Sequence, residues 1–168
     1  TTEKKLQALV LCQSRDLAMQ VAEEIRKILK DKKDLLVATV YGGQKIGMQF
    51  RDLKEKPQII VGTPGRIMDH LARKTIKMNT VQFFVLDEAD EMLDMGFRDD
   101  LEEILDATPG ERRTLLFSAT MPKPIVALAK RYQRDALRIS TVGDDQGRGD
   151  IVYQAIAVTP ADIENAVI

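Results

Sequence analysis

The sequence predicts an α/β fold in which helices cover both faces of a mostly parallel central sheet. Two observations support this. Short apolar runs recur along the chain, as expected for strands buried on both faces. Amphipathic stretches separate these runs, and the alternation of strand and helix implies parallel strands joined by right-handed crossovers. A length of 168 residues with 44% hydrophobic and 30% charged side chains suits a folded domain with one core.

The expected elements follow one another in a regular order. The five strands are predicted over residues 6–11, 35–40, 58–61, 81–86 and 114–117. Between the first two, apolar side chains repeat at helical spacing from Leu17 to Leu29, with charged side chains on the other face. Further helices are predicted over residues 44–54, 64–72, 91–106 and 122–133. Ligands of such sheets bind at the carboxyl ends of the strands, so polar residues there are the candidate site.

The pattern changes after Asp135. Residues 136–140 predict one more strand, and residues 143–150 form a polar, glycine-rich stretch typical of a linker. An apolar run resumes at residue 151 and is followed by the start of a helix. We therefore expect a first, partial domain over residues 1–142, a linker over 143–150, and the incomplete start of a second domain over 151–168.

Composition excludes several classes of protein. The single cysteine, Cys12, rules out an internal disulfide and favours a reducing compartment, so we expect a cytoplasmic protein. No apolar run approaches the roughly 20 residues of a membrane span, so no membrane partner is expected. A net charge of -1 and a pI near 5.9 argue against a broadly basic nucleic-acid binder. Any nucleic acid must be held by a local site.

Two of the expected strand ends have features of an anion-binding site. Ser14 is placed to cap the helix after the first strand, and Arg15 lies in its first turn, next to free backbone N–H groups. Gly42 and Gly43 follow the second strand, where the lack of side chains lets a sugar-phosphate chain approach the backbone.

A third anion site is predicted after the next strand. Thr63 suits a helix cap, Pro64 suits the first helical position, and Gly65 permits close approach of a ligand. Arg66 adds a planar fork for phosphate oxygens. The three sites together suggest one extended polyanion. Since they address phosphate and sugar, binding should be largely independent of base sequence.

The fourth strand runs directly into carboxylates, Asp87, Glu88 and Asp90, at the start of a helix. A nucleotide-hydrolysing enzyme needs one acid to hold Mg²⁺ and a second to orient the attacking water. Ser118 and Thr120 follow the fifth strand, where their hydroxyls are placed to hydrogen-bond Asp90.

Four motifs together match a known family in their order and approximate spacing. They are Gly42-Gly43, Thr63-Pro64-Gly65-Arg66, Asp87-Glu88-Ala89-Asp90 and Ser118-Ala119-Thr120. The chain resembles the DEAD-box family of ATP-dependent RNA helicases, and the resemblance covers nearly its whole length. It implies a RecA-like three-layer fold for residues 1–142, the first, N-terminal domain of two, which lacks the phosphate-loop strand and helix. Residues 151–168 would begin the second RecA-like domain, so the chain would be truncated at both ends.

The resemblance also implies roles for the acidic and hydroxyl residues, with ATP and Mg²⁺ as cofactors. Asp87 would hold Mg²⁺ through water, and Glu88 would activate the hydrolytic water. Asp90, Ser118 and Thr120 would couple the nucleotide to the RNA and to the second RecA-like domain of the same polypeptide. ATP-driven closure of such a pair of domains separates RNA strands locally, because the closed form binds a bent single strand.

RNA is the partner that the resemblance implies, and its backbone would contact residues of the three anion sites. These are Ser14, Arg15, Gly42, Gly43, Thr63, Gly65 and Arg66. Preference for RNA over DNA would rest on 2′-hydroxyl contacts.

Two departures from the family pattern affect this interpretation. Gln13 and Ser14 stand where the family usually has proline and threonine, and Asp16 replaces a glutamate. The sequence also contains no Gly-x-x-x-x-Gly-Lys-Ser/Thr phosphate loop, since Gly42 and Gly47 have the right spacing but no lysine follows. The family places this loop ahead of residue 6. We therefore expect that the chain is part of a longer protein and that alone it neither binds ATP tightly nor hydrolyses it.

Simpler interpretations of the same residues remain open. The carboxylates can oppose a helix dipole, the hydroxyls can be caps, the glycines can form a turn, and the arginines can be solvated. The second candidate function is a catalytically silent RNA-binding or scaffold module of the same fold, which the missing phosphate loop favours for this chain. His70 is expected to be an incidental helix residue, and Cys12 a small buried side chain.

Overall fold

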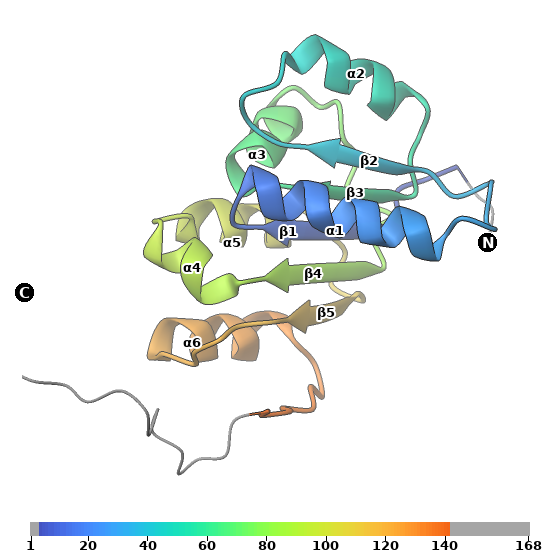
Figure 1. Cartoon of the computed structure of the whole chain (residues 1–168). Helices are drawn as coiled ribbons and strands as arrows, with labels where there is room; N and C mark the ends of the chain where they lie inside the picture. Colours follow the sequence, from blue (N-terminus) through green and yellow to red (C-terminus); the bar gives the residue numbers. More distant parts are fainter. Residues whose placement is uncertain (1–3, 142–168) are drawn as a thin grey trace, which may run out of the picture. The chain divides into compact units, whose positions relative to one another are not determined.

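The computed structural model describes residues 4–141, which fall into two units, one ending at Asp135 and one beginning at Ala136. The first unit contains a five-stranded parallel sheet in the order β2-β3-β1-β4-β5 (Figure 1). The strands are β1 (Ala8–Cys12), β2 (Val37–Val40), β3 (Ile59–Gly62), β4 (Phe83–Asp87) and β5 (Arg113–Leu116). The predicted α/β class and parallel sheet are confirmed.

Helices lie on both faces of this sheet, with α1 in front of it and α3 and α5 behind it in Figure 1. They are α1 (Arg15–Ile28), α2 (Ile46–Lys54), α3 (Pro64–Ala72), α4 (Ala89–Asp94), α5 (Arg98–Asp106) and α6 (Lys123–Tyr132). The alternation of strand and helix that the sequence shows therefore builds the expected three layers.

Side chains of β1 show how the sheet is buried on both faces. Leu9 and Leu11 are fully buried in the larger core, which includes apolar residues of α3 and α5. Val10 and Cys12 point to the opposite face and pack with α1 and β3. Successive residues of a strand alternate between faces, so a continuous apolar run is what a doubly covered strand requires. The expected burial of Cys12 is confirmed.

The helix predicted over residues 91–106 is wrong as a single element, because the structure has two helices there, α4 and α5. Gly96 adopts a φ of +86° just after α4 ends, a conformation that a helix interior cannot contain. The break turns Met95 outward, where it is 55% exposed, whereas Met92 is buried in the core.

The strand predicted over residues 136–140 is also wrong, since the structure has no strand there. Leu137 and Ile139 are 83% and 79% exposed. An apolar run forms a strand only when a neighbour supplies the ladder hydrogen bonds, and no strand of residues 4–141 pairs with this one. The predicted linker, 143–150, and second-domain start, 151–168, lie outside the described residues. No helix in the described part of the chain is long and apolar enough to cross a membrane.

Candidate functional site

The residues predicted to be functional follow the carboxyl ends of the five parallel strands, which lie at one edge of the sheet, on the left in Figure 1. We call this edge the rim. Its arginine half, after β1, β2 and β3, comprises Ser14, Arg15, Gly42, Gly43, Thr63, Gly65 and Arg66. Its acidic half, after β4 and β5, comprises Asp87, Glu88, Asp90, Ser118 and Thr120.

Arg15 and Gly43 adjoin each other in the arginine half. The exposed guanidinium of Arg15 lies 5.3 Å from the ring centroid of Tyr41, at a distance suited to a cation–π contact. Gly43 has a φ of +83°, and a Cβ built on it would lie 3.6 Å from Arg15 Nη1. The loops after β1 and β2 therefore meet, although they are far apart in the sequence.

The two predicted helix caps differ in the structure. Ser14 is the N-cap of α1, and its hydroxyl accepts a hydrogen bond from the Leu17 N–H at 3.2 Å, as predicted. Thr63 occupies the N-cap position of α3, but its hydroxyl makes no capping hydrogen bond. Its N–H instead donates to Val40 O at 3.0 Å, which holds the ends of β2 and β3 together. Gly65 is exposed, with open space at its Cβ position.

Arg66 is more buried than expected for a guanidinium that only binds phosphate, since its side chain is 15% exposed. Its Nη1 donates to Gln44 O at 3.0 Å and to Gln49 Oε1 at 3.3 Å. Its Nε lies 3.4 Å from Asp69 Oδ2. Its Nη2 has no hydrogen-bond partner within residues 4–141. One side of the guanidinium is thus engaged in the fold, and the other remains for a ligand.

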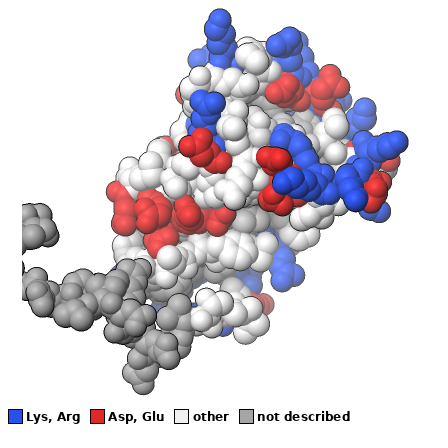
Figure 2. All heavy atoms as spheres, in the orientation of Figure 1, with Lys and Arg blue, Asp and Glu red and all other residues white. Residues whose placement is uncertain are grey.

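Acidic side chains gather around α4, as Figure 2 shows. Burial raises the pKa of Asp87, and the neighbouring charge of Glu88 raises it further, while a hydrogen bond from the Glu88 backbone opposes both. Glu88 precedes α4 with a φ of +53°, a left-handed conformation that costs a non-glycine residue roughly 1–2 kcal/mol. Such strain is common at functional sites.

The predicted link between Asp90 and the hydroxyls after β5 is confirmed for Thr120 but not for Ser118, whose hydroxyl bonds another partner. Asp90 Oδ2 accepts hydrogen bonds from the Thr120 N–H and the Thr120 hydroxyl, both at 2.8 Å. Burial alone would raise the pKa of Asp90, but these bonds outweigh it, and the pKa lies below its usual value. The Ser118 hydroxyl donates to Thr120 O at 2.7 Å. Asp90 Oδ1 is buried with no partner in the described part of the chain.

Gln13 connects the two halves of the rim. Its amide donates to Glu88 Oε2 at 2.9 Å, so the end of β1 contacts the residue after β4. On the other side, the Ala89 N–H donates to Phe117 O at 3.0 Å and joins the ends of β4 and β5. The sequence shows Gln13 only as a departure from the family pattern, and its contact with Glu88 was not predicted.

His70 is not an incidental helix residue, which corrects the prediction. It is fully buried, and both ring nitrogens lie within hydrogen-bond distance of other side chains, Thr75 Oγ1 and Gln49 Oε1. The signal that could have revealed it is a lone histidine on the apolar face of a helix, next to Leu71.

The acidic half suits a divalent cation by its donor chemistry. Asp87 and Glu88 supply carboxylate oxygens, the ligands that Mg²⁺ prefers, and one or two carboxylates with phosphate oxygens are its common setting. Burial and, second, the charge of Glu88 raise the pKa of Asp87, and a bound cation would favour its ionised form. Within residues 4–141, no group of three or more His, Cys, Asp and Glu side chains is placed to hold a metal alone.

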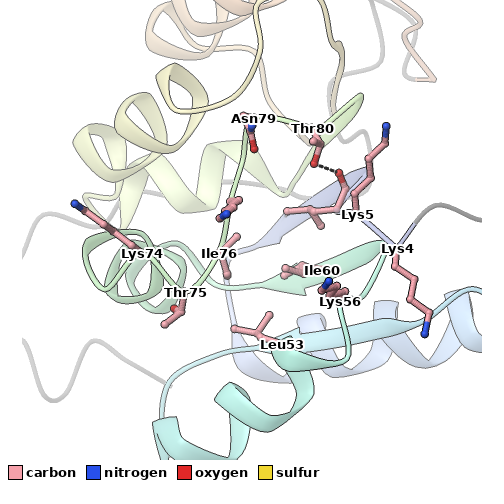
Figure 3. A pocket seen from close by; sticks show the side chains of 12 residues that line it. Lys4, Lys5, Leu53, Lys56, Ile60, Lys74, Thr75, Ile76, Asn79 and Thr80 are labelled. Carbon is pink, nitrogen blue, oxygen red and sulfur yellow. Dashed lines mark hydrogen bonds between the residues drawn. The ribbon is translucent and has the colours of Figure 1, made fainter.

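A separate pocket of about 440 Å³ lies away from the rim (Figure 3). Its walls include residues just before β1, β3 and β4, so it belongs to the amino ends of the strands. We call its charged members the lysine edge; they are Lys4, Lys5, Lys56, Lys74 and Lys77. No residue predicted to be functional lines this pocket.

Comparisons with known proteins agree with the motifs of the rim. The model of the DEAD/DEAH box helicase family matches residues 1–128. The DEAD-box ATP-dependent RNA helicase CshA of Bacillus subtilis is 55% identical over 130 residues, which are 77% of this chain and 26% of that protein. The ATP-dependent RNA helicase CshA of Listeria monocytogenes is 56% identical over 127 residues, 76% of this chain and 24% of that protein.

Solved structures show the same fold. A DEAD box protein from the hyperthermophile Methanococcus jannaschii matches with a TM-score of 0.75 and 49% identity, over 80% of this chain and 37% of that one. The yeast DEAD-box splicing factor Prp28 matches with a TM-score of 0.73 and 35% identity, over 77% of this chain and 32% of that one. The chain spans about a quarter of the length of the curated relatives it matches. It belongs to the DEAD/DEAH box helicase family.

Proposed function

We propose that the chain is part of the first RecA-like domain of an ATP-dependent RNA helicase. The complete polypeptide would couple ATP binding and hydrolysis to local RNA unwinding or to remodelling of RNA–protein complexes. The observation that carries the proposal is the continuity of the rim. Gln13, which directly precedes Ser14 of the arginine half, donates to Glu88, and Asp90 is bonded to Thr120 within the acidic half, so the proposed RNA and nucleotide sites would share one edge.

The arginine half would bind the RNA backbone. The guanidinium of Arg15 is exposed and makes no hydrogen bond or ion pair within residues 4–141, and Arg66 retains its Nη2 group for phosphate oxygens. Gly42, Gly43 and Gly65 are all exposed and leave the backbone open to a sugar-phosphate chain. Because these groups do not address base edges, binding would be largely independent of sequence.

The acidic half would act on the nucleotide. Asp87 would hold Mg²⁺ through water, and Glu88 would orient the water that attacks the terminal phosphate, while the bound Mg²⁺ neutralises charge on the phosphates. Asp90, Ser118 and Thr120 form one hydrogen-bonded unit. This unit would transmit the state of the nucleotide to the RNA and to a second RecA-like domain. We also propose a cytoplasmic location, which the single cysteine, Cys12, favours.

Substituting Glu88→Gln tests the catalytic assignment in a polypeptide that carries these residues together with a Gly-Lys phosphate loop. Loss of the base should lower kcat for ATP hydrolysis by about 10²-fold or more. ATP-dependent RNA binding should persist, since the amide keeps the size of the side chain. Unchanged turnover would remove Glu88 from its role.

The isolated chain is a separate case, because its sequence contains no Gly-x-x-x-x-Gly-Lys-Ser/Thr segment. Without the lysine and the cradle of N–H groups, the carboxylates alone hold a triphosphate poorly. We therefore propose that these 168 residues do not hydrolyse ATP. A single-turnover assay at high protein concentration tests this, and hydrolysis above the buffer rate would refute it.

The second candidate is a silent RNA-binding or scaffold module of the same fold. The two candidates differ in their need for Asp87 and Glu88. In a helicase, ATP strengthens RNA binding through these carboxylates. In a silent module, RNA affinity is the same with and without ATP, even when the coding sequence upstream of residue 1 is included.

A further inference from the structure

A buried polar network lies beneath the arginine half, and the function proposed above assigns it no role. Its centre is formed by Gln49 of α2 and His70 of α3, both fully buried. Buried polar side chains are retained where their hydrogen bonds fix a specific geometry, because an unsatisfied group there costs stability. The partners of these two side chains show which geometry is fixed.

Gln49 holds the turn that carries the two glycines. Its Nε2 donates to Tyr41 O at 2.8 Å and to Gln44 Oε1 at 3.1 Å, so it fastens both ends of the 41–44 turn. Its Oε1 accepts a hydrogen bond from Arg66 Nη1, which also donates to Gln44 O. Two consecutive glycines give this turn high conformational freedom. The anchors at its ends therefore determine its conformation.

The tautomer of His70 follows from these contacts. A guanidinium only donates, so the Gln49 atom that faces Arg66 is the oxygen. His70 Nε2 lies 2.9 Å from the same oxygen and must therefore carry a proton. In a neutral ring, Nδ1 at 2.7 Å from Thr75 Oγ1 is then the acceptor, so the single proton of the Thr75 hydroxyl points to Nδ1 and not to His70 O at 3.1 Å. Burial, with the nearby charge of Arg66 second, lowers the pKa of His70, which agrees with a neutral ring.

We propose that His70 and Gln49 are positioning residues for the RNA backbone, which act by holding the 41–44 turn and Arg66 in the binding conformation. The inference rests on the proposed RNA-binding function of the rim. Nε2–H of His70 orients the Gln49 amide, and that amide sets the turn beside Arg15 and directs the free side of Arg66 outward. Neither positioning residue touches the RNA itself.

Variants of the 168-residue chain can separate positioning from general stability. Gln49→Leu and His70→Phe remove the network and keep side-chain bulk. His70→Gln restores a donor at the position of Nε2, whereas His70→Asn restores only the position of Nδ1. The matched control is Gln58→Leu, since Gln58 is 1% exposed and donates to Asp34 O at 3.1 Å, also fastening a loop by its amide, but before β3.

Two measurements apply to each variant, and a third applies to the parent chain. Fluorescence anisotropy gives the dissociation constant for a labelled single-stranded oligouridine RNA, and hydrogen exchange reports the order of amides 42–45. We expect Gln49→Leu, His70→Phe and His70→Asn to weaken RNA binding about tenfold and to speed exchange in the turn. His70→Gln should stay within about threefold of the parent, and Gln58→Leu should change neither value. A long-range ¹H–¹⁵N spectrum should show His70 protonated at Nε2.

The outcomes distinguish a failure of the positioning role from a failure of the proposed RNA-binding function. If the parent chain binds RNA and the network variants bind it equally well, the positioning role is wrong and the proposed function stands. Equal losses for His70→Gln and His70→Asn, or protonation at Nδ1, would also overturn it. If the parent chain binds no RNA, the proposed function fails. Where His70→Phe does not fold, the contrast between His70→Gln and His70→Asn decides.

Discussion

The two halves of the rim differ in how their charged groups are compensated. In the arginine half, the Nη1 group of Arg66 is bound within the fold, and the buried amide of Gln49 has partners on both its nitrogen and its oxygen. In the acidic half, Asp87 and Glu88 are adjacent carboxylates in the chain, and Asp90 Oδ1 is buried without a partner in the described residues. The arginine half therefore has a hydrogen-bonded scaffold without any ligand, whereas the acidic half has neighbouring carboxylates that pair with no cationic side chain in residues 4–141.

This difference indicates what each half contributes. Crowded carboxylates lower the stability of a fold, and a cation restores the balance. A hydrogen-bonded scaffold with an exposed guanidinium does not need a ligand to keep its shape. We therefore expect the charges of the ligand-free acidic half to affect the free energy of unfolding. We expect the geometry of the arginine half to determine RNA affinity. Seven substitutions in four groups sharpen this comparison, and the groups follow in order of expected effect on unfolding free energy.

The largest effect is expected at Asp90. Asp90→Ala leaves two donors of Thr120 without their acceptor and should lower the free energy of unfolding by about 2 kcal/mol in urea at pH 7. Asp90→Asn keeps an oxygen for the same donors and should cost less than about 1 kcal/mol. Equal losses for the two variants would show that the hydrogen bonds with Thr120 do not hold this half together.

Substitutions of the two arginines should lower the free energy of unfolding by different amounts in the same urea assay. Arg66→Ala removes two hydrogen bonds from a mostly buried guanidinium and should cost about 1.5 kcal/mol. Arg15→Ala removes only an exposed cation–π contact with Tyr41 and should cost about 0.5 kcal/mol. If Arg15→Ala is as destabilising as Arg66→Ala, the arginine half is not the scaffold described above.

Gly43 and Gly42 form a matched pair within the turn. Gly43→Ala forces a side chain into a φ of +83° and should cost about 1 kcal/mol. Gly42→Ala meets open space and no positive φ, so stability should change little. Thermal unfolding followed by circular dichroism gives both values. A larger loss for Gly42→Ala would contradict the backbone conformation of this turn.

The smallest effect is a pH-dependent gain at Asp87. Its pKa is raised by burial and by Glu88, so the folded state binds the proton more tightly than the unfolded state. Stability is therefore lost as the pH rises through the range from the usual aspartate pKa to the raised one. Asp87→Asn should stabilise the chain at pH 7 by less than about 1 kcal/mol, because solvent screens the charge.

The advantage of Asp87→Asn should shrink as the pH falls to about 3, where the parent carboxyl is mostly protonated in both states. Asp90 gives the opposite pH dependence of stability, because its pKa is lowered in the folded state. The stability that ionised Asp90 contributes is present above the usual aspartate pKa and is lost as the pH falls through its lowered value. Unfolding curves measured from pH 3 to pH 8 on the parent and both asparagine variants test the two signs together.

Local patterns in the sequence were sufficient to predict the fold and the rim. Strands buried on both faces appear as short apolar runs, and their carboxyl ends must meet at one edge when the strands are parallel. The position of each motif at such an edge follows from this rule alone. The contact between Asp90 and Thr120 was predicted on the same basis and is confirmed.

Features set by distant parts of the chain were not predictable in this way. The break at Gly96 depends on the backbone conformation of one residue, and residues 136–140 match a strand pattern without a partner strand. The burial of His70 depends on Gln49 and Thr75. Likewise, the Gln13 amide reaches Glu88 only because β1 and β4 are neighbours in the sheet.

The central claim is that RNA binds the rim and not the lysine edge. Titrating the ¹⁵N-labelled chain with a single-stranded oligouridine RNA tests this directly, with DNA of matching length as a control. The account predicts amide shifts at Arg15, Gly42, Gly43, Gly65 and Arg66, smaller shifts with DNA, and none at Lys56 or Lys74. Shifts confined to Lys56, Lys74 and their neighbours would contradict it.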